Sequence, residues 1–201
     1  MRKPRDAEDT RERVLAAAAE QFAAHGFAGT SLAAISKACG ISDGLILHHF
    51  QTKQTLYRQV LEEMSGRYAQ VLAQAQASAG SPEQAMLRTL EATFNFWKQD
   101  RTYQRISQWA ALEGRSELAQ QEAGLTAALV REVERLQQQG LVDRRYAPMV
   151  FLTMIIGPIQ FWLRYRDQFK ASLALSDSSD AMDALFLEQL TGLVKEMSQR
   201  K

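Results

Sequence analysis

Apolar residues recur at helical spacing along almost the whole chain, and alternating strand patterns are hard to find. The first helical stripe covers about 6–24 and is followed by His25-Gly26, where a glycine can end a helix. Two short helical segments follow within 30–50, separated by Gly40. Long helices occupy the rest of the chain. The pattern predicts an all-α protein in which a small helical module precedes a larger helical body.

Capping signals place several helix boundaries. Thr52 fits the N-cap of a long helix that reaches Ala77. In the clearest break of the chain, Ser81 fits an N-cap, Pro82 fits the first helical position and Gln84 completes a capping box. The other predicted helices run from Asp100 to Leu112, from Ser116 to Gly140, over 146–169 and over 179–199.

Composition and charge restrict the function classes. The net charge of +1 gives no global field toward nucleic acid or an anionic membrane, so any such signal must be local. The single cysteine, Cys39, excludes an intrachain disulfide framework and fits a reducing compartment. The charged N-terminus lacks the apolar core of a signal peptide, and the longest apolar run, 148–163, is short and contains two prolines. We expect a cytoplasmic protein without a membrane partner.

The adjacent residues His48 and His49 raise the question of a metal or catalytic site. Their side chains diverge by about 100° on a helix, whereas helical metal pairs are spaced i, i+3 or i, i+4. The only other histidine is His25, and no acidic cluster lies nearby in the sequence. Ser42 and Asp43 have no recognisable base or orienting partner. We therefore expect no metal, no cofactor and no enzymatic activity.

The stretch from Thr30 to Phe50 has the form helix, tight turn, helix. Gly40 lies where the chain must turn sharply, and glycine adopts a positive φ at little cost. Such a unit presents its second helix outward, with the N-terminal end suited to a DNA major groove. Spacing alone leaves a plain three-helix bundle as an alternative.

The same stretch resembles the signature of the TetR family of ligand-responsive transcriptional repressors. The chain reads FAAHGFAGTSLAAISKACGISDGLILHHFQTKQTLY, and the positions in register with the family are Phe22, Gly26, Phe27, Thr30, Ser31, Ile35, Gly40, Ser42, Gly44, Phe50, Lys53 and Leu56. The resemblance implies about nine helices, with a DNA-binding domain over 1–52 and a ligand-binding and dimerisation domain over 53–201. It also implies three partners: double-stranded operator DNA, a small-molecule effector and a second copy of the chain.

Carried over by position, the resemblance assigns phosphate contacts to the start of the second helix and to Lys53, and groove contacts to the third helix. The basic arm of Arg2, Lys3 and Arg5 is a further candidate for DNA contact. The implied DNA-binding residues are Thr30, Ser31, Ser42, Asp43, Gly44, Leu45, Leu47, His48, His49 and Lys53.

Three of these positions depart from the family pattern. Leu45 and Leu47 replace residues that donate hydrogen bonds, and Asp43 replaces a lysine or polar residue. Leucine can still meet a thymine methyl, and aspartate can accept from a cytosine amino group. We therefore predict that base contacts depend more on His48 and His49 than is usual in the family.

The last two helices carry more apolar surface than one helical hairpin needs, which predicts a four-helix contact between protomers; an intramolecular core is the alternative. The candidate interface residues are Phe151, Ile155, Ile159, Trp162, Leu185, Phe186, Leu190, Leu193, Val194 and Met197. Large apolar side chains in the middle helices and in the helix that follows them predict a mainly apolar ligand pocket, although each aromatic alone is more typical of a core than of a ligand wall. The candidate lining residues are Phe94, Trp97, Tyr103, Arg105, Ile106, Trp109, Met154 and Phe161.

These features together predict a dimeric DNA-binding regulator, a repressor released from a pseudo-palindromic operator by a small, mainly apolar ligand. The alternative is a helical protein that binds a ligand or partner and whose DNA module is weakened. Asp43, Leu45 and Leu47 are the residues that favour this alternative.

Overall fold

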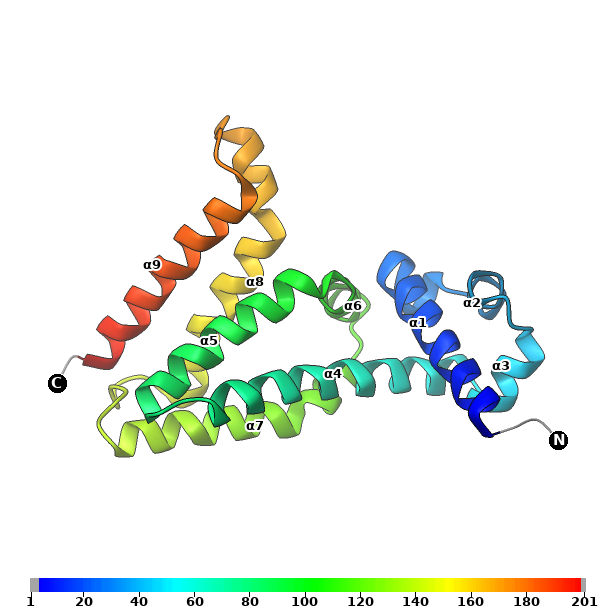
Figure 1. Ribbon diagram of the computed structural model, residues 1–201, viewed down its shortest axis with the longest axis horizontal. Coiled ribbons are helices and arrows are strands. Elements are labelled where there is room, and N and C mark those ends of the chain that lie inside the picture. The colour runs from blue at the N-terminus through cyan, green and yellow to red at the C-terminus, as the bar shows by residue number, and fades with distance from the viewer. Residues whose placement is uncertain (1–3, 200–201) are drawn as a thin grey trace. The chain divides into compact units, whose positions relative to one another are not determined.

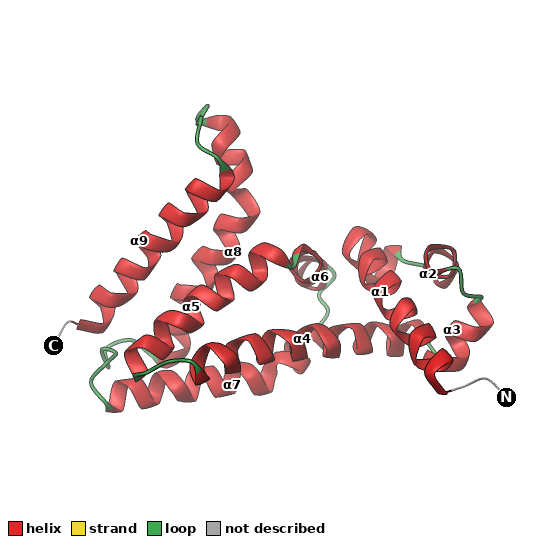
Figure 2. Ribbon diagram, viewed as in Figure 1, coloured by secondary structure: helices red, strands yellow, loops and turns green. Residues whose placement is uncertain are grey.

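The computed structural model describes residues 4–199, and every regular element within that range is a helix (Figures 1 and 2). The all-α prediction is confirmed, and the described residues form nine helices. Their bounds are α1 Pro4–Gly29, α2 Leu32–Cys39, α3 Asp43–Phe50, α4 Lys53–Ala77, α5 Pro82–Gln99, α6 Arg101–Leu112, α7 Glu117–Gln138, α8 Pro148–Ser172 and α9 Ser179–Gln199. Residues 1–3, which include most of the predicted basic arm, lie outside this range.

The predicted N-caps are formed by local hydrogen bonds, which explains why sequence alone located them. In each, a side-chain oxygen accepts the backbone N–H three residues later. The distances are 3.0 Å from Thr55 N to Thr52 Oγ1, 3.2 Å from Gln84 N to Ser81 Oγ and 2.9 Å from Tyr103 N to Asp100 Oδ1. The predicted capping box differs in one detail, because Gln84 Oε1 accepts from Gly80 N rather than from the N-cap residue.

Helix α1 does not stop at the predicted position. Gly26 breaks the regular geometry with φ 71° and ψ 179°, and one further turn continues to Gly29. Only glycine adopts this combination of angles readily. The glycine signal was therefore interpreted correctly as a break, but the chain resumes a helical turn beyond it.

The chain divides into two compact units, which are described separately. The first contains residues up to 67 together with 100–123, and the second contains 68–99 and 124 onward. Helix α6 belongs to the first unit because it packs on α1. This division does not coincide with the domain boundary predicted at residue 52.

The core of the first unit is built around aromatic side chains. Phe22 and Tyr57 are almost completely buried, and their rings meet edge to face with centroids 4.9 Å apart. Phe27 also meets Tyr57, at 5.1 Å. Burial raises the pKa of Tyr57 to about 12, so its hydroxyl stays protonated.

The second unit has an apolar core and a separate buried ion pair. The apolar cluster contains Val133, Leu136, Val142, Phe151 and Met197. The ion pair joins Arg166 on α8 to Asp183 on α9, which also accepts a hydrogen bond from Trp162 Nε1 at 2.8 Å. Lys98 Nζ lies 3.0 Å from Asp183 Oδ2. Asp183 therefore joins α9 to α8 and α5, because each of the latter two helices supplies it with a donor.

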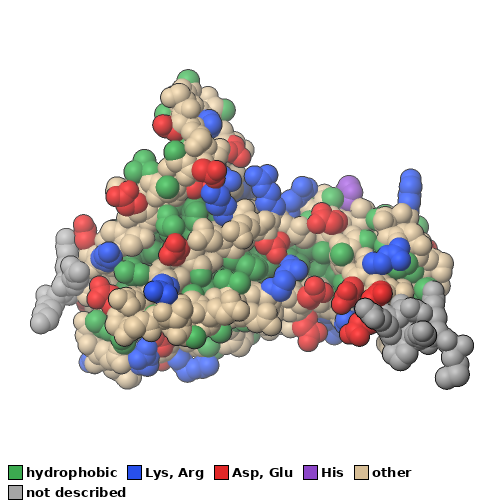
Figure 3. Space-filling model, viewed as in Figure 1, with side chains coloured by type: hydrophobic (Ala, Val, Ile, Leu, Met, Phe, Trp, Pro, Cys, Tyr) green, Lys and Arg blue, Asp and Glu red, His purple; other side chains and the backbone are tan. Residues whose placement is uncertain are grey.

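No helix among the described residues is long and apolar enough to cross a bilayer. On the face seen in Figure 3, basic and acidic side chains are interspersed with apolar ones. This agrees with the net charge of +1 and leaves local geometry as the guide to any binding surface.

Candidate functional site

Helices α2 and α3 form the predicted helix-turn-helix. Gly40 ends α2 in the left-handed region, with φ 67° and ψ 28°, and its N–H donates to Ser36 O at 2.9 Å. The apolar residues Ile35, Ile46 and Phe50 are buried beneath the two helices. Burial of Ile46 leaves the neighbouring positions of α3 to face outward.

The outward face of α3 contains most of the residues assigned to the DNA groove. Ser42, Asp43, Gly44 and His48 are exposed. Leu47 is 40% exposed, which leaves its methyl groups available for contact. Leu45 and His49 are partly buried. The Ser42 hydroxyl makes no capping hydrogen bond, so it is available to a phosphate.

The end of α3 is joined to α4 by a very tight turn. Gln51 has φ 65° and ψ −50°, and Thr52 N donates to Phe50 O at 2.7 Å. These values are those of a γ-turn, which is strained for any residue other than glycine. The turn connects the candidate recognition helix directly to the first turn of α4.

Two predicted phosphate ligands are instead engaged inside the protein. Thr30 is only 2% exposed, and its hydroxyl is shared between Gly26 O at 2.7 Å and Gln21 O at 3.0 Å. Lys53 Nζ donates to Phe27 O and to Thr30 O, each at 2.8 Å. In this structure both side chains satisfy carbonyl groups around the end of α1, and their contact with phosphate stays a prediction. Ser31 is exposed, and its hydroxyl accepts from Ala34 N as the N-cap of α2.

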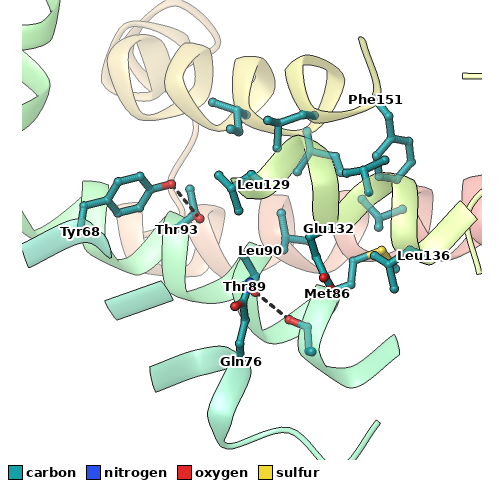
Figure 4. A pocket seen from close by; sticks show the side chains of 16 residues that line it. Tyr68, Gln76, Met86, Thr89, Leu90, Thr93, Leu129, Glu132, Leu136 and Phe151 are labelled. Atoms are coloured by element: carbon teal, nitrogen blue, oxygen red, sulfur yellow. Dashed lines mark hydrogen bonds between the residues drawn. The ribbon is translucent and has the colours of Figure 1, made fainter. Parts of the chain in front are cut away.

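The second unit contains a mainly apolar cavity of about 70 Å³ (Figure 4). The cavity is bordered by side chains from α4, α5, α7, α8 and α9. Its lining residues are Tyr68, Gln76, Ala85, Met86, Thr89, Leu90, Thr93, Leu129, Glu132, Val133, Leu136, Phe151, Leu152, Ile155, Ile156 and Val194. Its volume has room for several water molecules, and the flexible Met86 in its wall allows a larger occupant.

The polar groups of the cavity are few, and most of them are already paired. Tyr68 Oη and Thr93 Oγ1 lie 3.1 Å apart at one end, as the dashed line in Figure 4 marks. Thr89 Oγ1 donates to the carbonyl of Ala85 at 2.8 Å. The Glu132 carboxylate accepts from Arg135 Nε at 2.8 Å. The cavity therefore offers hydroxyl groups that can exchange partners, but no unpaired charge.

None of the predicted pocket residues lines this cavity, so that assignment is not supported. The residues on α6 belong to the first unit, where Tyr103 and Ile106 are buried and Trp109 bonds to α1. On α8, Met154 and Phe161 are exposed. The others are also elsewhere: Phe94 stacks on Phe186, Trp97 lies against Tyr68, and Arg105 is exposed.

The sequence missed the cavity because its lining residues lie on α7, α8 and α9 as well as on α4 and α5. Leu129 and Val133 on α7 carry no signal other than ordinary helical periodicity. Periodicity shows that such residues are buried and leaves their partners unspecified. Only the packing of five helices shows that they enclose a space.

The predicted dimer residues divide into two groups. Five are buried within the protomer itself, as the alternative of an intramolecular core predicts: Phe151, Ile159, Leu190, Val194 and Met197. Ile155, Trp162 and Phe186 are partly buried, and the last two stack on each other. Leu185 and Leu193 on α9 are 57% and 50% exposed. Exposed apolar residues on α8 that were not assigned to the interface are Met149, Val150, Met154, Phe161 and Phe169.

Comparison with known proteins agrees with this arrangement. Residues 14–60 match the family of bacterial regulatory proteins of the tetR type, and residues 90–189 match the tetracyclin repressor-like C-terminal domain. The transcriptional regulator TtgR of Pseudomonas putida is 28% identical over 177 residues, which cover 81% of this chain and 84% of TtgR. UidR of Escherichia coli is 43% identical over 56 residues, but these cover only 28% of this chain and 29% of UidR.

Solved structures show the same fold over nearly the whole chain. The transcriptional regulator SCO4942 of Streptomyces coelicolor has a TM-score of 0.74 and 26% identity, with 96% of this chain and 99% of SCO4942 covered. The fatty acid degradation regulator FadR of Bacillus halodurans has a TM-score of 0.72, 17% identity and 96% coverage of each chain, and it shows the fold alone. The chain belongs to the TetR family and is a DNA-binding transcriptional regulator, not an enzyme.

Proposed function

We propose that this regulator is a dimeric repressor that binds two half-sites of an operator through α3 and is released by a small, uncharged, mainly apolar molecule. The observation that carries the DNA-binding half is the exposed outer face of α3, with Ser42, Leu47 and His48 free of contacts that would hold them inside the protein. Dimerisation doubles the number of base contacts available to an eight-residue helix.

Base recognition depends chiefly on His48 and His49 in this proposal. Leu45 and Leu47 offer only apolar contact with thymine methyl groups, and Asp43 repels phosphate. Histidine can donate or accept at base edges. The test is anisotropy titration of a labelled operator, selected with the wild-type protein from a random DNA pool. Substitution of both His48 and His49 by alanine should weaken binding at least about tenfold. The control is His25→Ala, an exposed histidine on α1, and unchanged binding by the double variant would refute the assignment.

The exposed apolar side chains of α8 and α9 are the proposed interface. Phe161 on α8 and Leu185 and Leu193 on α9 are at least half exposed in the protomer. Large apolar side chains in such a set mark an association surface. Leu193→Glu should convert the dimer to a monomer in light scattering coupled to size exclusion. Leu112→Glu, at an apolar residue on α6 that is 73% exposed, should leave the molar mass unchanged.

The proposed effector site is the cavity of the second unit. Its lining is apolar except for hydroxyl and amide groups and the paired carboxylate of Glu132. Burying an ion there without a partner costs more free energy than its apolar contacts return. We therefore expect naphthalene and 1-naphthol to bind and 1-naphthoate to be excluded. The hydroxyl of 1-naphthol can join the pair of Tyr68 and Thr93.

The effector test combines thermal shift with operator release. 1-Naphthol should raise Tm and weaken operator binding, and Ala85→Leu, which fills part of the cavity, should abolish both effects. Ala128→Leu on the exposed face of α7 is the matched control. Equal binding of 1-naphthoate and 1-naphthol would contradict the proposed chemistry of the site.

The internal bonding of Lys53 favours one alternative, a ligand- or partner-binding regulator with weak DNA affinity. Lys37 on α2 and Arg58 on α4 are exposed cations near the motif, whereas Lys53 is partly buried. Failure of the wild-type protein to enrich any sequence from the random pool would favour this alternative over the repressor.

A further inference from the structure

The break in α1 leaves backbone groups without their usual helical partners. Gly26 interrupts the helix, so the N–H groups of Phe27 and Ala28 begin a new turn. We call residues 26–30 the α1–α2 junction. Ser31, the N-cap of α2, follows it immediately. The geometry of this junction therefore sets where the helix-turn-helix begins.

The missing partners come from a segment about 85 residues away in sequence. Glu113 Oε2 accepts from Phe27 N at 3.2 Å, and Glu113 Oε1 accepts from Ala28 N at 3.0 Å. Trp109 Nε1 donates to Ala23 O, just before the break, at 3.2 Å. One carboxylate at the end of α6 therefore caps both free amides of the junction.

The approach of α6 to the junction is very close. A Cβ atom added at Gly26 would lie 2.4 Å from Glu113 Oε1 and 2.9 Å from Trp109 Cε3. The glycine thus serves two purposes, because it permits the backbone angles and leaves room for these two side chains. Because closely packed side chains are hardly compressible, a displacement of α6 moves the junction directly.

Cations hold the same junction from other segments. Arg115 lies over the Phe27 ring, with Cζ 3.6 Å from the centroid, and Lys53 Nζ lies 4.3 Å from it. Lys53 also donates to the carbonyls of Phe27 and Thr30. The junction therefore has its amides bound by Glu113 and two of its carbonyls bound by Lys53.

Chain continuity connects this contact to the cavity. Helix α5 contributes Leu90 and Thr93 to the cavity lining, and Asp100, which directly follows α5, is the N-cap of α6. A shift of α5 along its axis is therefore carried into α6 through one residue. Glu113 is the residue that immediately follows α6.

We propose that Glu113 is a positioning residue for DNA binding: by capping Phe27 and Ala28 it orients α2 and α3, and through it occupancy of the cavity reaches the DNA. The part of this proposal that concerns DNA binding is based on the family assignment. The part that concerns the effector rests on the proposed function. Two charge-assisted hydrogen bonds make this the strongest polar contact of α6 with the junction.

The test compares Glu113→Ala and Glu113→Gln with Glu134→Gln, a substitution on the exposed face of α7. Operator binding is measured by anisotropy, naphthol binding by fluorescence, and exchange of the amides of 27–50 by mass spectrometry. Glu113→Ala should weaken operator binding at least about tenfold and speed amide exchange across 27–50. Glu113→Gln should lie between it and the wild type, because an amide oxygen can still cap one N–H.

The ratio of operator affinities without and with 1-naphthol separates positioning from mere stability. In Glu113→Ala this ratio should approach one, while the affinity for 1-naphthol stays unchanged. A purely structural role would lower Tm and leave the ratio as in the wild type, which would overturn the proposal. If Glu113→Ala does not fold, the same ratio is measured in Glu113→Gln. Operator affinity equal to that of the wild type in Glu113→Gln would then overturn the proposal. Absence of a naphthol effect on the wild type refutes the effector site instead, and the operator arm still tests Glu113.

Discussion

Substitution of Gly26 by alanine is expected to be among the most damaging single changes to the first unit. With φ at 71° and ψ at 179°, any other residue pays about 1–3 kcal/mol in backbone strain. The added methyl would also lie 2.4 Å from the Glu113 carboxylate, which must move away. Weakening its two hydrogen bonds to backbone amides costs roughly a further 1–3 kcal/mol.

The sum, about 2–6 kcal/mol, is a large share of the roughly 5–15 kcal/mol that stabilises a typical domain. Urea unfolding followed by far-UV circular dichroism measures it as a lower midpoint at an unchanged slope. The matched control is Gly66→Ala on an exposed face of α4, where a Cβ meets nothing within 4 Å. That change should stabilise the helix by about 0.5–1 kcal/mol.

The two glycines should therefore respond with opposite signs to the same substitution. A Gly26→Ala variant whose free energy of unfolding lies within about 0.5 kcal/mol of the wild-type value, as for an ordinary surface substitution, would refute the close approach of α6 to α1. Destabilisation by Gly66→Ala would show that α4 is not a regular exposed helix at that position.

Three further changes test other parts of the structure. Burial raises the pKa of Glu122 from 4.5 to about 7. Between these two pH values the folded state holds a proton that the unfolded state releases, so the free energy of unfolding falls as pH rises. Urea titrations of the wild type should therefore show a loss of roughly 1–3 kcal/mol between pH 4.5 and pH 8, and Glu122→Gln should remove that loss. Asp183→Ala leaves the buried Arg166 without its carboxylate and should cost about 3–5 kcal/mol, whereas a loss under 1 kcal/mol in urea unfolding would show that water replaces the carboxylate. Thr30→Val should destabilise by about 1 kcal/mol and leave the operator affinity of the folded protein unchanged, because its hydroxyl bonds to carbonyls rather than to phosphate; weaker operator binding by the folded variant would support the phosphate contact.

Interactions between residues close in sequence were accessible without the structure. The caps at Thr52, Ser81 and Asp100 each join a side chain to an amide three residues away, so their signals lie within one turn. Gly40 was found for the same reason, because the turn it makes is complete within a few residues. The helix-turn-helix could thus be located, and its resemblance to the TetR family indicated DNA binding.

Interactions between distant segments were decided only by the tertiary structure. Lys53 has the same sequence context whether its ammonium faces phosphate or caps two carbonyls of the α1–α2 junction. The Glu113 contact joins residues about 85 positions apart, and no local pattern announces it. Likewise, helical periodicity placed Phe151 and Val194 on the apolar faces of their helices, but their burial within the protomer depends on which helices pack around them. Helical periodicity determines which face of a helix avoids water, and the packing of the helices determines what that face meets.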